Sequence, residues 1–390
     1  MKRTKNKKRT IAIIGNGCSA LWLARHAAGN GFECTVFGEE PIAAFSSTRN
    51  QGWLQSGAFY AGRADYQTAL DCWTGFSDVA AYAPYAVRRE TPCYFFFKDR
   101  GEAMQWRRRC ASVGFTPLEM HVRQAIPIEP KLDDCQFPFL YQTLDCPIDT
   151  HALMNGLVRD CLHHGVQFKT LPLRETSVAR DRNAWMVEVN NRRLGDVSYG
   201  AVVLACGAYI KRFCEGVSSL LADEFVPTKV GVLSVTGLSL NAFLLAKVEE
   251  GPYLVPFFAG GKHGFTVCLD GTDEEVQDIE HPTATSLPDH FEEKVFNAIR
   301  FAFPSIGRAL LAAKKSTHVC QKIYRRGKAT GTPKRSRIAL DAQTVSEDLK
   351  GLFVLYPGKF TTAHLAARDC FALIVGSEET GVKVSVQPYG

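Results

Sequence analysis

The first forty residues alternate between short apolar runs and a longer amphipathic segment. Residues 11–14 and 34–37 are apolar and β-prone, and apolar residues recur at helical spacing over 21–28. The two apolar runs are typical of strands buried in a parallel sheet, and the spacing of apolar residues over 21–28 is typical of a helix. The pattern therefore predicts a βαβ unit at the start of the chain.

The remaining pattern continues in an α/β style. Residues 149–164 are predicted as a helix, because Asp149 can cap its start and Gly165 can end it. The other expected strands are 93–97, 166–168, 184–189, 201–205, 229–235 and 352–355, and the other expected helices are 288–303 and 361–375.

This order predicts two domains, which a length of 390 residues also favours. The expected fold class is α/β, and α+β overall, with a Rossmann-type nucleotide-binding domain in three pieces and a mixed-sheet substrate domain inserted twice. The expected pieces are 10–84, 148–222 and 335–390 for the nucleotide-binding domain, 85–147 and 223–334 for the substrate domain, and 1–9 for a basic, disordered tail.

The positive charge of the chain is concentrated at one end. The formal net charge is +6, and six Lys and Arg residues fall within positions 2–9, which leaves 40 basic and 40 acidic residues elsewhere. A neutral body argues against nucleic acid as a partner. The basic run predicts either a solvated tail or a weak contact with an anionic membrane surface or RNA.

Cysteine usage and hydropathy bear on the cellular compartment. The 13 cysteines include no C-x-x-C pair, which favours reduced thiols over disulfides or a zinc site. No apolar run approaches the roughly 20 residues that span a bilayer, and we expect no signal peptide. A cytoplasmic protein is therefore predicted, with peripheral contact at the inner face of the membrane through the tail as an alternative. No metal-ligand spacing is seen.

The turn after the first apolar run carries a G-x-G-x-x-A motif. Gly15 permits a tight turn, Gly17 allows the backbone to approach a pyrophosphate, and Ala20 allows close packing of helix on strand. Cys18 and Ser19 lie between them, at the start of a helix whose N-terminus would face the phosphates. The motif predicts a dinucleotide site but leaves FAD, NAD and NADP open.

Three motifs together resemble the flavoenzymes of the D-amino acid oxidase and glycerol-3-phosphate dehydrogenase superfamily. Residues 46–57 are similar to the T-S-S-(R/A)-S-(T/S)-K-L-(I/L)-H-G-G stretch of aerobic glycerol-3-phosphate dehydrogenases. Residues 203–209 are similar to V-(L/V)-A-(A/C)-G-(A/P)-(W/Y), and residues 356–362 to Y-G-G-K-(I/L)-T-T. The L-2-hydroxyglutarate oxidases share the looser pattern near residues 52–60. By composition alone, 46–57 would be an ordinary polar loop.

This resemblance implies non-covalent FAD and a Rossmann-type FAD-binding domain of the glutathione-reductase-like kind. The family's ribose-binding acid falls at Gly38, and we expect Glu39 to take that role rather than to be an exposed loop carboxylate. The expected cofactor-binding residues are Gly15, Gly17, Cys18, Ser19, Ala20, Glu39, Ser47, Thr48, Arg49, Asn50, Gln51, Gly52, Gly207, Gly358, Lys359, Phe360, Thr361 and Thr362.

Two departures from the family motifs concern the substrate. Gln55 stands where the H-G-G step has histidine, so Gln55 is a candidate catalytic residue. Phe59 stands where the dehydrogenases have the arginine that touches the substrate phosphate. Both changes argue against glycerol 3-phosphate itself as the substrate.

An arginine in the last third of the chain is the expected substrate clamp. Arg325 falls where these families have the arginine of a G-(L/V)-R-P segment, and a guanidinium suits the capture of a carboxylate or phosphate. Arg335 and Arg337 lie near a second family arginine, although a solvated basic loop is an alternative for the cluster. His263 is a further candidate substrate contact, with an exposed hairpin turn as its alternative.

The last motif has a physical interpretation of its own. A helix that begins at Thr361 directs free N–H groups toward whatever lies beyond Lys359. Reduced flavin is negatively charged, so a lysine and a helix N-terminus would stabilise it and raise its reduction potential. The alternative is an exposed turn lysine.

We therefore predict an FAD-dependent oxidase or dehydrogenase that oxidises a C–N or C–O bond of a small anionic substrate. The expected substrates are an amino acid, an N-substituted amino acid or a 2-hydroxy acid, with hydride transfer to flavin N5 and reoxidation by oxygen or a quinone. One alternative is a polyol-phosphate dehydrogenase that passes electrons to a quinone. Another is an RNA-modifying flavoprotein, which the neutral body opposes.

Overall fold

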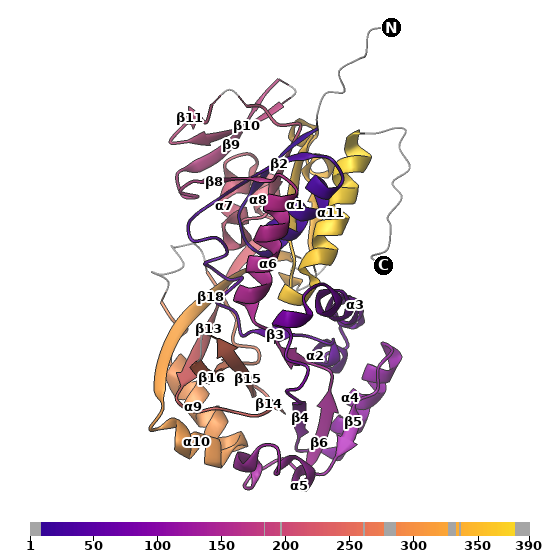
Figure 1. The fold of residues 1–390 in the computed structure, drawn as a ribbon, viewed down its shortest axis with the longest axis vertical. Coiled ribbons are helices and arrows are strands. Elements are labelled where there is room, and N and C mark those ends of the chain that lie inside the picture. The colour runs from indigo at the N-terminus through magenta and orange to yellow at the C-terminus, as the bar shows by residue number, and fades with distance from the viewer. Residues whose placement is uncertain are drawn as a thin grey trace.

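The molecule consists of two large sheets with helices packed against each (Figure 1). The computed structural model describes residues 9–182, 184–195, 197–259, 262–276, 286–326, 333–334 and 337–378. A six-stranded sheet occupies the upper end of the molecule in Figure 1, and a ten-stranded sheet occupies the lower end. The α/β class expected from the sequence is confirmed.

The six-stranded sheet has the order β20-β21-β12-β1-β2-β8 and is parallel except for β20, which runs antiparallel to β21. Its central strands are apolar throughout because both faces are covered. Helices α1, α6 and α11 cover one face, while a three-stranded sheet, α7 and α8 cover the other. The strands are β1 (Thr10–Ile14), β2 (Glu33–Gly38), β8 (Gln167–Thr170), β12 (Ala201–Leu204), β20 (Ile338–Asp341) and β21 (Leu352–Tyr356).

A three-stranded sheet and several helices complete this half of the molecule. The small sheet consists of β9 (Thr176–Asp181), β10 (Ala184–Val189) and β11 (Arg192–Arg193). The helices are α1 (Cys18–Gly29), α3 (Tyr66–Tyr82), α6 (Thr150–His163), α7 (Ile210–Glu215), α8 (Ser219–Ala222) and α11 (Ala363–Glu378).

The ten-stranded sheet has the order β19-β18-β13-β16-β15-β14-β4-β6-β5, and β17 pairs with β13. The strand β4 (Cys93–Phe97) is apolar at every position because both faces are buried: Phe95 faces Trp106 of α4, and Phe96 faces Phe303 beside α9. The other strands are β5 (Leu118–Met120), β6 (Phe139–Thr143), β13 (Phe225–Thr236), β14 (Phe243–Lys247), β15 (Pro252–Ala259), β16 (Lys262–Leu269), β17 (Glu274–Glu275), β18 (Lys314–Arg326) and β19 (Pro333–Lys334).

Short elements complete the fold. The strands β3 (Trp53–Leu54) and β7 (Cys146–Pro147) form a two-stranded sheet between the two halves. The helices of the large-sheet half are α2 (Ala58–Gly62), α4 (Arg100–Ser112), α5 (Val122–Ala125), α9 (Phe291–Ala302) and α10 (Pro304–Leu310). Single 3-10 turns are η1 (Pro84–Ala86), η2 (Pro130–Leu132), η3 (Gly207–Tyr209), η4 (Ala342–Thr344), η5 (Glu347–Leu349) and η6 (Phe360–Thr362).

The expected elements agree with the structure in kind and differ mainly at their ends. The helix expected over 149–164 is α6, and the Asp149 side chain caps it by accepting a hydrogen bond from the Ala152 N–H at 2.9 Å. The helix expected from Thr361 is preceded by the turn η6, so α11 begins at Ala363. Helix α3 has no counterpart among the expected elements.

The strands of the two sheets come from interleaved stretches of the chain. The six-stranded sheet draws on residues 10–38, 167–204 and 338–356, and the ten-stranded sheet on 93–143 and 225–334. The domain boundaries given above remain a prediction.

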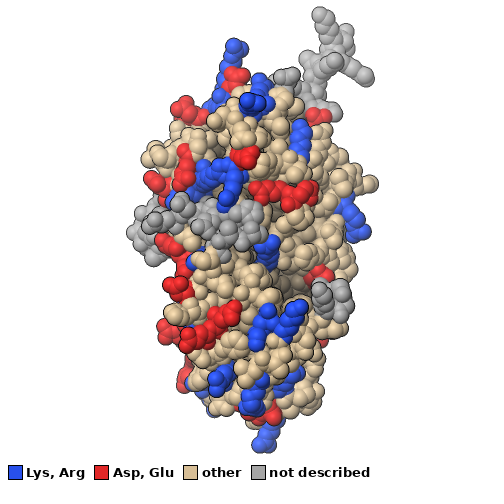
Figure 2. All heavy atoms as spheres, turned by 90° about the vertical axis from the view of Figure 1, so that its left-hand side faces the viewer, with Lys and Arg blue, Asp and Glu red and all other residues tan. Residues whose placement is uncertain are grey.

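The surface and the helices bear on possible interactions. Figure 2 shows basic and acidic side chains interspersed on one face of the molecule, without a large area of one sign. Within the described ranges, no helix combines the length and the apolar character that crossing a bilayer requires.

Candidate cofactor and substrate site

An open cavity lies between the two sheets, at the carboxyl ends of β1, β12 and β21. This is where doubly wound sheets bind nucleotides. Its empty space is about 1530 Å³, including open solvent at the mouth. The wall on the side of the six-stranded sheet is formed by 15–19, 205–209 and 356–360. The wall on the side of the large sheet is formed by 269–271, 273 and 320–322.

The glycine-rich turn has the close approaches that a pyrophosphate cradle requires. Gly15 has φ +112°, and a Cβ there would lie 2.4 Å from the Ala205 carbonyl oxygen. A Cβ on Gly17 would lie 2.9 Å from the Ser47 hydroxyl oxygen, which accepts a hydrogen bond from the Cys18 N–H at 2.9 Å. Since the first turn of α1 also lines the cavity, its free N–H groups fit an anionic diphosphate. These residues fit the expected dinucleotide.

The end of β2 explains the departure at Gly38. A Cβ on Gly38 would lie 2.4 Å from Cγ of Asn16, and the Asn16 amide donates a hydrogen bond to the Glu39 carbonyl oxygen at 2.6 Å. The Glu39 carboxylate accepts a hydrogen bond from the Leu173 N–H at 2.9 Å, and Leu173 lines the cavity. Glu39 itself is not among the lining residues, so its ribose contact stays a prediction.

The polar loop after β2 separates two cavities. Ser46 and Ser47 line the main cavity, Thr48, Arg49 and Gly52 line a second one, and Asn50 and Gln51 line both. The Asn50 side chain holds the loop in shape, because its amide donates to the carbonyls of 46 and 47 and its oxygen accepts from the N–H of 52. The expectation that the whole segment lines one cofactor cavity is met only in part.

The turn between β21 and α11 brings Lys359 to the cavity. Gly358, with φ +68°, Lys359 and Phe360 line it. Thr361 and Thr362 are buried behind the turn: the Thr361 hydroxyl accepts from the Gln55 N–H at 3.0 Å, and the Thr362 hydroxyl donates to the Lys359 carbonyl oxygen at 3.1 Å.

Lys359 and Gln55 both reach the cavity, as the sequence suggested. The Lys359 ammonium nitrogen lies 4.9 Å from the centroid of the Tyr60 ring. Gln55 follows β3, and its side-chain oxygen lies 3.7 Å from the sulfur of Cys72.

A buried carboxylate fixes the segment that carries Gln55. Asp145 accepts hydrogen bonds from Trp53 Nε1 at 2.8 Å, from the Ser56 N–H at 2.9 Å and from the Thr143 hydroxyl at 2.8 Å. Burial raises the pKa of Asp145, although these donors favour the charged form. No motif in the sequence indicates this carboxylate.

The structure does not place the predicted substrate residues at the cavity. Arg325 pairs with Glu224 at 2.6 Å and is not a lining residue. Arg337 pairs with Asp369 at 2.8 Å and with Asp71, which joins the start of β20 to α11 and α3. His263 is exposed on β16 and lies away from the cavity, and Arg335 lies outside the described residues.

Arg325 does not line the cavity because the cavity meets β18 at an earlier point along the strand. Cys320, Gln321 and Lys322 line the cavity, and Arg325 is three residues further on, about 10 Å along an extended strand. The structure therefore does not support the substrate clamp expected at Arg325: Arg325 is a partner of Glu224 there. Among the described side chains of β18, the cation that lines the cavity is Lys322.

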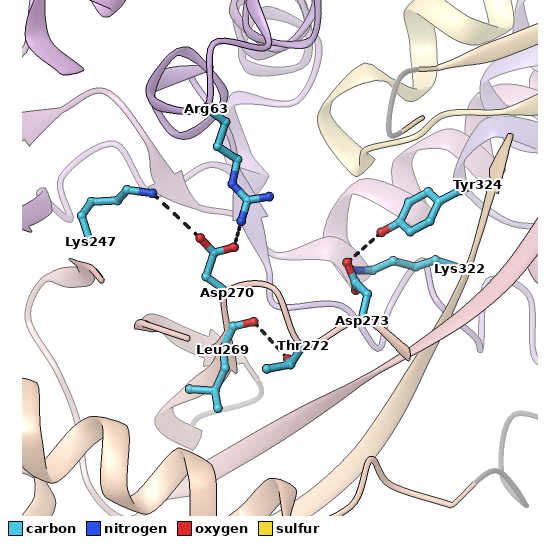
Figure 3. A network of polar contacts seen from close by, with 8 residues as sticks. All are labelled: Arg63, Lys247, Leu269, Asp270, Thr272, Asp273, Lys322 and Tyr324. Atoms are coloured by element: carbon cyan, nitrogen blue, oxygen red, sulfur yellow. Dashed lines mark hydrogen bonds and ion pairs between the residues drawn. The ribbon is translucent and has the colours of Figure 1, made fainter. Parts of the chain in front are cut away.

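The turn after β16 carries two carboxylates that the sequence did not single out (Figure 3). Asp270 lies between Arg63, with which it forms an ion pair, and Lys247, whose nitrogen is 3.9 Å from Asp270 Oδ2. Both cations also lie 4.6 Å from the centroid of the Phe59 ring. Phe59, which replaces a family arginine, is thus flanked by the cation at the end of its own helix and by a cation from β14.

The second carboxylate is Asp273. It accepts hydrogen bonds from the Lys322 ammonium group at 3.1 Å and from the Tyr324 hydroxyl at 3.0 Å. No motif could have revealed this cluster, because its members come from β18 and from a turn about fifty positions earlier.

Comparison with known proteins identifies the class that this fold and cradle define. The model of the family described as FAD dependent oxidoreductase matches residues 10–368. The chain belongs to this family, and is an enzyme whose cofactor is FAD.

Two curated relatives from different organisms have the same name. The chain is 24% identical over 283 residues to one component of the anaerobic glycerol-3-phosphate dehydrogenase of Escherichia coli K12, covering 70% of this chain and 49% of that protein. It is 26% identical over 275 residues to the Haemophilus influenzae protein of the same name, covering 67% of this chain and 46% of that one. The chain thus spans about half the length of the curated relatives that it matches.

Solved structures share the fold at lower identity. The FAD-bound L-alpha-glycerophosphate oxidase from Mycoplasma pneumoniae superposes with a TM-score of 0.71 at 15% identity, covering 95% of both chains. Glycine oxidase from Geobacillus kaustophilus superposes with a TM-score of 0.68 at 16% identity, covering 96% of this chain and 97% of that one.

Proposed function

We propose that this chain uses non-covalently bound FAD to oxidise a C–N or C–O bond of a small anionic molecule, such as an amino acid, an N-substituted amino acid or a 2-hydroxy acid. The observation that supports it is the joint presence, in one cavity, of the nucleotide cradle and of Lys322 and Lys359. When bound, FAD supplies the two-electron acceptor, and oxygen or a quinone would reoxidise it.

The residues of the cavity have separable roles in this proposal. Lys322 and Lys359 attract an anion, while Phe59, Tyr60 and Tyr253 provide an apolar wall that keeps water away from it. Fixing the substrate in one orientation removes much of the entropic barrier to reaction. An apolar wall also suits an amino or hydroxy acid better than a polyol.

A second candidate is a polyol-phosphate dehydrogenase that passes electrons to a quinone. It is favoured by the similarity to proteins named glycerol-3-phosphate dehydrogenase and by the turn at 356–362. It is opposed by Phe59 and Gln55, which replace the family arginine and histidine.

One experiment tests both candidates. The flavin of the purified protein is mixed without oxygen with a panel of amino acids, N-methyl amino acids, 2-hydroxy acids and polyol phosphates, and the loss of its visible absorption is recorded. We expect bleaching by a member of the first three groups. Bleaching by a polyol phosphate alone would favour the second candidate, and no bleaching by any group would contradict both.

The mode of FAD binding is tested separately by acid precipitation. A yellow supernatant that contains FAD supports non-covalent binding. Colour that stays with the precipitate would show a covalent bond.

A further inference from the structure

A second cavity lies across the loop 46–52 from the cofactor cavity. Its empty space is about 1090 Å³, including open solvent at the mouth. It is lined by 48–52, by 147–151 at the start of α6, and by residues of β13, β15, β16 and β18. Among the described residues, only Asn50 and Gln51 line both cavities, so the flavin site does not account for this second space.

Two arginines line the second cavity, and neither has a close counter-charge. The Arg49 guanidinium forms no hydrogen bond or ion pair within the part of the chain that the structure describes. The Arg88 guanidinium lies 4.0 Å from the carboxylate of Glu90, whose side chain is 70% exposed. A guanidinium at a cavity wall with its N–H donors unused is suited to bind the oxygens of an anion.

The start of α6 adds main-chain donors to the same cavity. Thr150 and His151 line it, and their N–H groups are the first two of the helix. Neither N–H group has an acceptor among the described residues. The positive end of the helix dipole lies at the same place, so this end of α6 favours an anion as the two arginines do.

The charges of the lining give a positive balance. The described lining holds two arginines and one carboxylate, Asp149, which is a net charge of +1 with the histidines neutral. The Asp149 carboxylate is occupied as the cap of α6, because it accepts a hydrogen bond from the Ala152 N–H at 2.9 Å. Burial lowers the pKa of His318, and its neutral ring donates a hydrogen bond from Nε2 to the Arg49 carbonyl oxygen at 3.0 Å.

The large sheet contributes a row of hydroxyl groups to the cavity. Ser316, Ser234 and Thr266 are direct neighbours across β18, β13 and β16, so their side chains lie on one face of the sheet. The Thr266 hydroxyl donates to the Gln51 carbonyl oxygen at 2.8 Å. Together with the bond from His318, this contact ties the loop to the sheet and fixes the main chain at Arg49 before a ligand binds.

We propose that the second cavity binds the phosphate group of a small molecule other than FAD, held by Arg49, Arg88 and the first turn of α6. These are three separate sets of donors, and a phosphate monoester has three free oxygens, whereas a carboxylate has two. The row of hydroxyls then faces the organic part of the ligand, which is therefore polar. This inference does not depend on which substrate the flavin oxidises.

The test measures phosphate binding without turnover. The FAD-loaded protein, whose nucleotide cradle is filled, is titrated calorimetrically with inorganic phosphate and, in parallel, with acetate, at constant ionic strength. We expect one phosphate per chain and weaker binding of acetate. In Arg49→Gln and in Arg88→Gln the Kd for phosphate should rise at least about tenfold, as for the loss of a hydrogen bond to a charged group.

Three further variants locate the bound phosphate. Arg89→Gln removes an exposed arginine that is adjacent in sequence but does not line the cavity, and it should leave the Kd unchanged. Arg88→Lys retains the charge but not the fork of donors and should restore part of the affinity. Lys322→Gln removes a cation of the cofactor cavity, and phosphate in the second cavity should bind this variant as it binds the wild type.

Each outcome decides the inference. The absence of phosphate binding by the wild type, or acetate binding that is at least as tight, would overturn it. So would an unchanged Kd in both Arg49→Gln and Arg88→Gln, or a loss of phosphate binding in Lys322→Gln alone, which would place the anion in the cofactor cavity. If Arg49→Gln loses its flavin, the comparison of Arg88→Gln with Arg89→Gln decides, because neither residue lines the cofactor cavity.

Discussion

The two walls of the cavity present their chemistry in different ways. On the side of the six-stranded sheet, a single turn lines the cavity, with close backbone approaches at Gly15 and Gly17. On the side of the large sheet, charged side chains from four separate elements meet, as Asp270 and Asp273 show. The first wall is specified by neighbours in sequence and the second by neighbours in space.

The two walls also differ in which substitutions destabilise them. A glycine cradle binds through N–H groups that are already fixed by strand and helix, so it tolerates no added volume. Buried ion pairs tolerate changes in volume but not the loss of one partner, because the other charge is then left unpaired. Substitutions should therefore act on the two walls by different mechanisms.

The largest effect is expected at the glycine cradle. Gly17→Val should abolish FAD binding, because its side chain would occupy the space beside Ser47 and the pyrophosphate position. The measurement is the flavin content of the purified protein, together with its melting temperature. Gly376→Ala is the control: at this exposed position on α11, no described atom outside the adjacent turns of the helix lies within 4 Å of the added Cβ, so flavin content should not change. A Gly17→Val protein that retains its flavin would show that the diphosphate does not lie there.

The same contrast explains what the sequence could predict. The βαβ unit, the cradle and the turn at Lys359 all have signals within about ten residues, such as apolar periodicity and glycine spacing. Such signals follow from backbone geometry and survive without knowledge of the tertiary fold. The resemblance to a known family then predicted FAD as the cofactor. The family and the cofactor were both confirmed.

The large-sheet wall could not be predicted in this way. Asp273 and Lys322 meet only because β18 pairs with β13 and places residue 322 beside the turn after β16. The sequence favoured Arg325 and did not single out Lys322, since alignment to a motif takes no account of where along a strand a cavity lies. The loop at 46–52 could not be assigned from its motif for the same reason, because some of its residues line one cavity and others line a second.

An intermediate effect is expected at Lys359, where local sequence and tertiary contact both contribute. Lys359→Met removes a positive charge at the turn before α11, so the two-electron reduction potential should fall by tens of millivolts. A charge at a helix end contributes about 0.3–2 kcal/mol, and ~30 mV corresponds to about 1.4 kcal/mol for such a couple. A dye-coupled reductive titration of both proteins measures the shift, and sulfite should bind the mutant flavin more weakly. An unchanged potential would indicate that Lys359 acts on the substrate or on Tyr60 instead.

The smallest effect is expected at Arg325, the position that the sequence favoured. Its side chain is 31% exposed and pairs with Glu224 outside the cavity, so Arg325→Gln should change kcat/KM by no more than about twofold, as for partly exposed positions remote from a site. Some stability should be lost, because Glu224 is only 14% exposed and loses its ion pair with Arg325. The double variant Glu224→Gln/Arg325→Gln should recover that stability, which a melting curve measures. A loss of kcat/KM of about thirtyfold or more with full flavin content would restore Arg325 as the clamp. It would also mean that the Arg325 side chain leaves Glu224 when the substrate binds, so that the contrast between the two walls would include motion as well as composition.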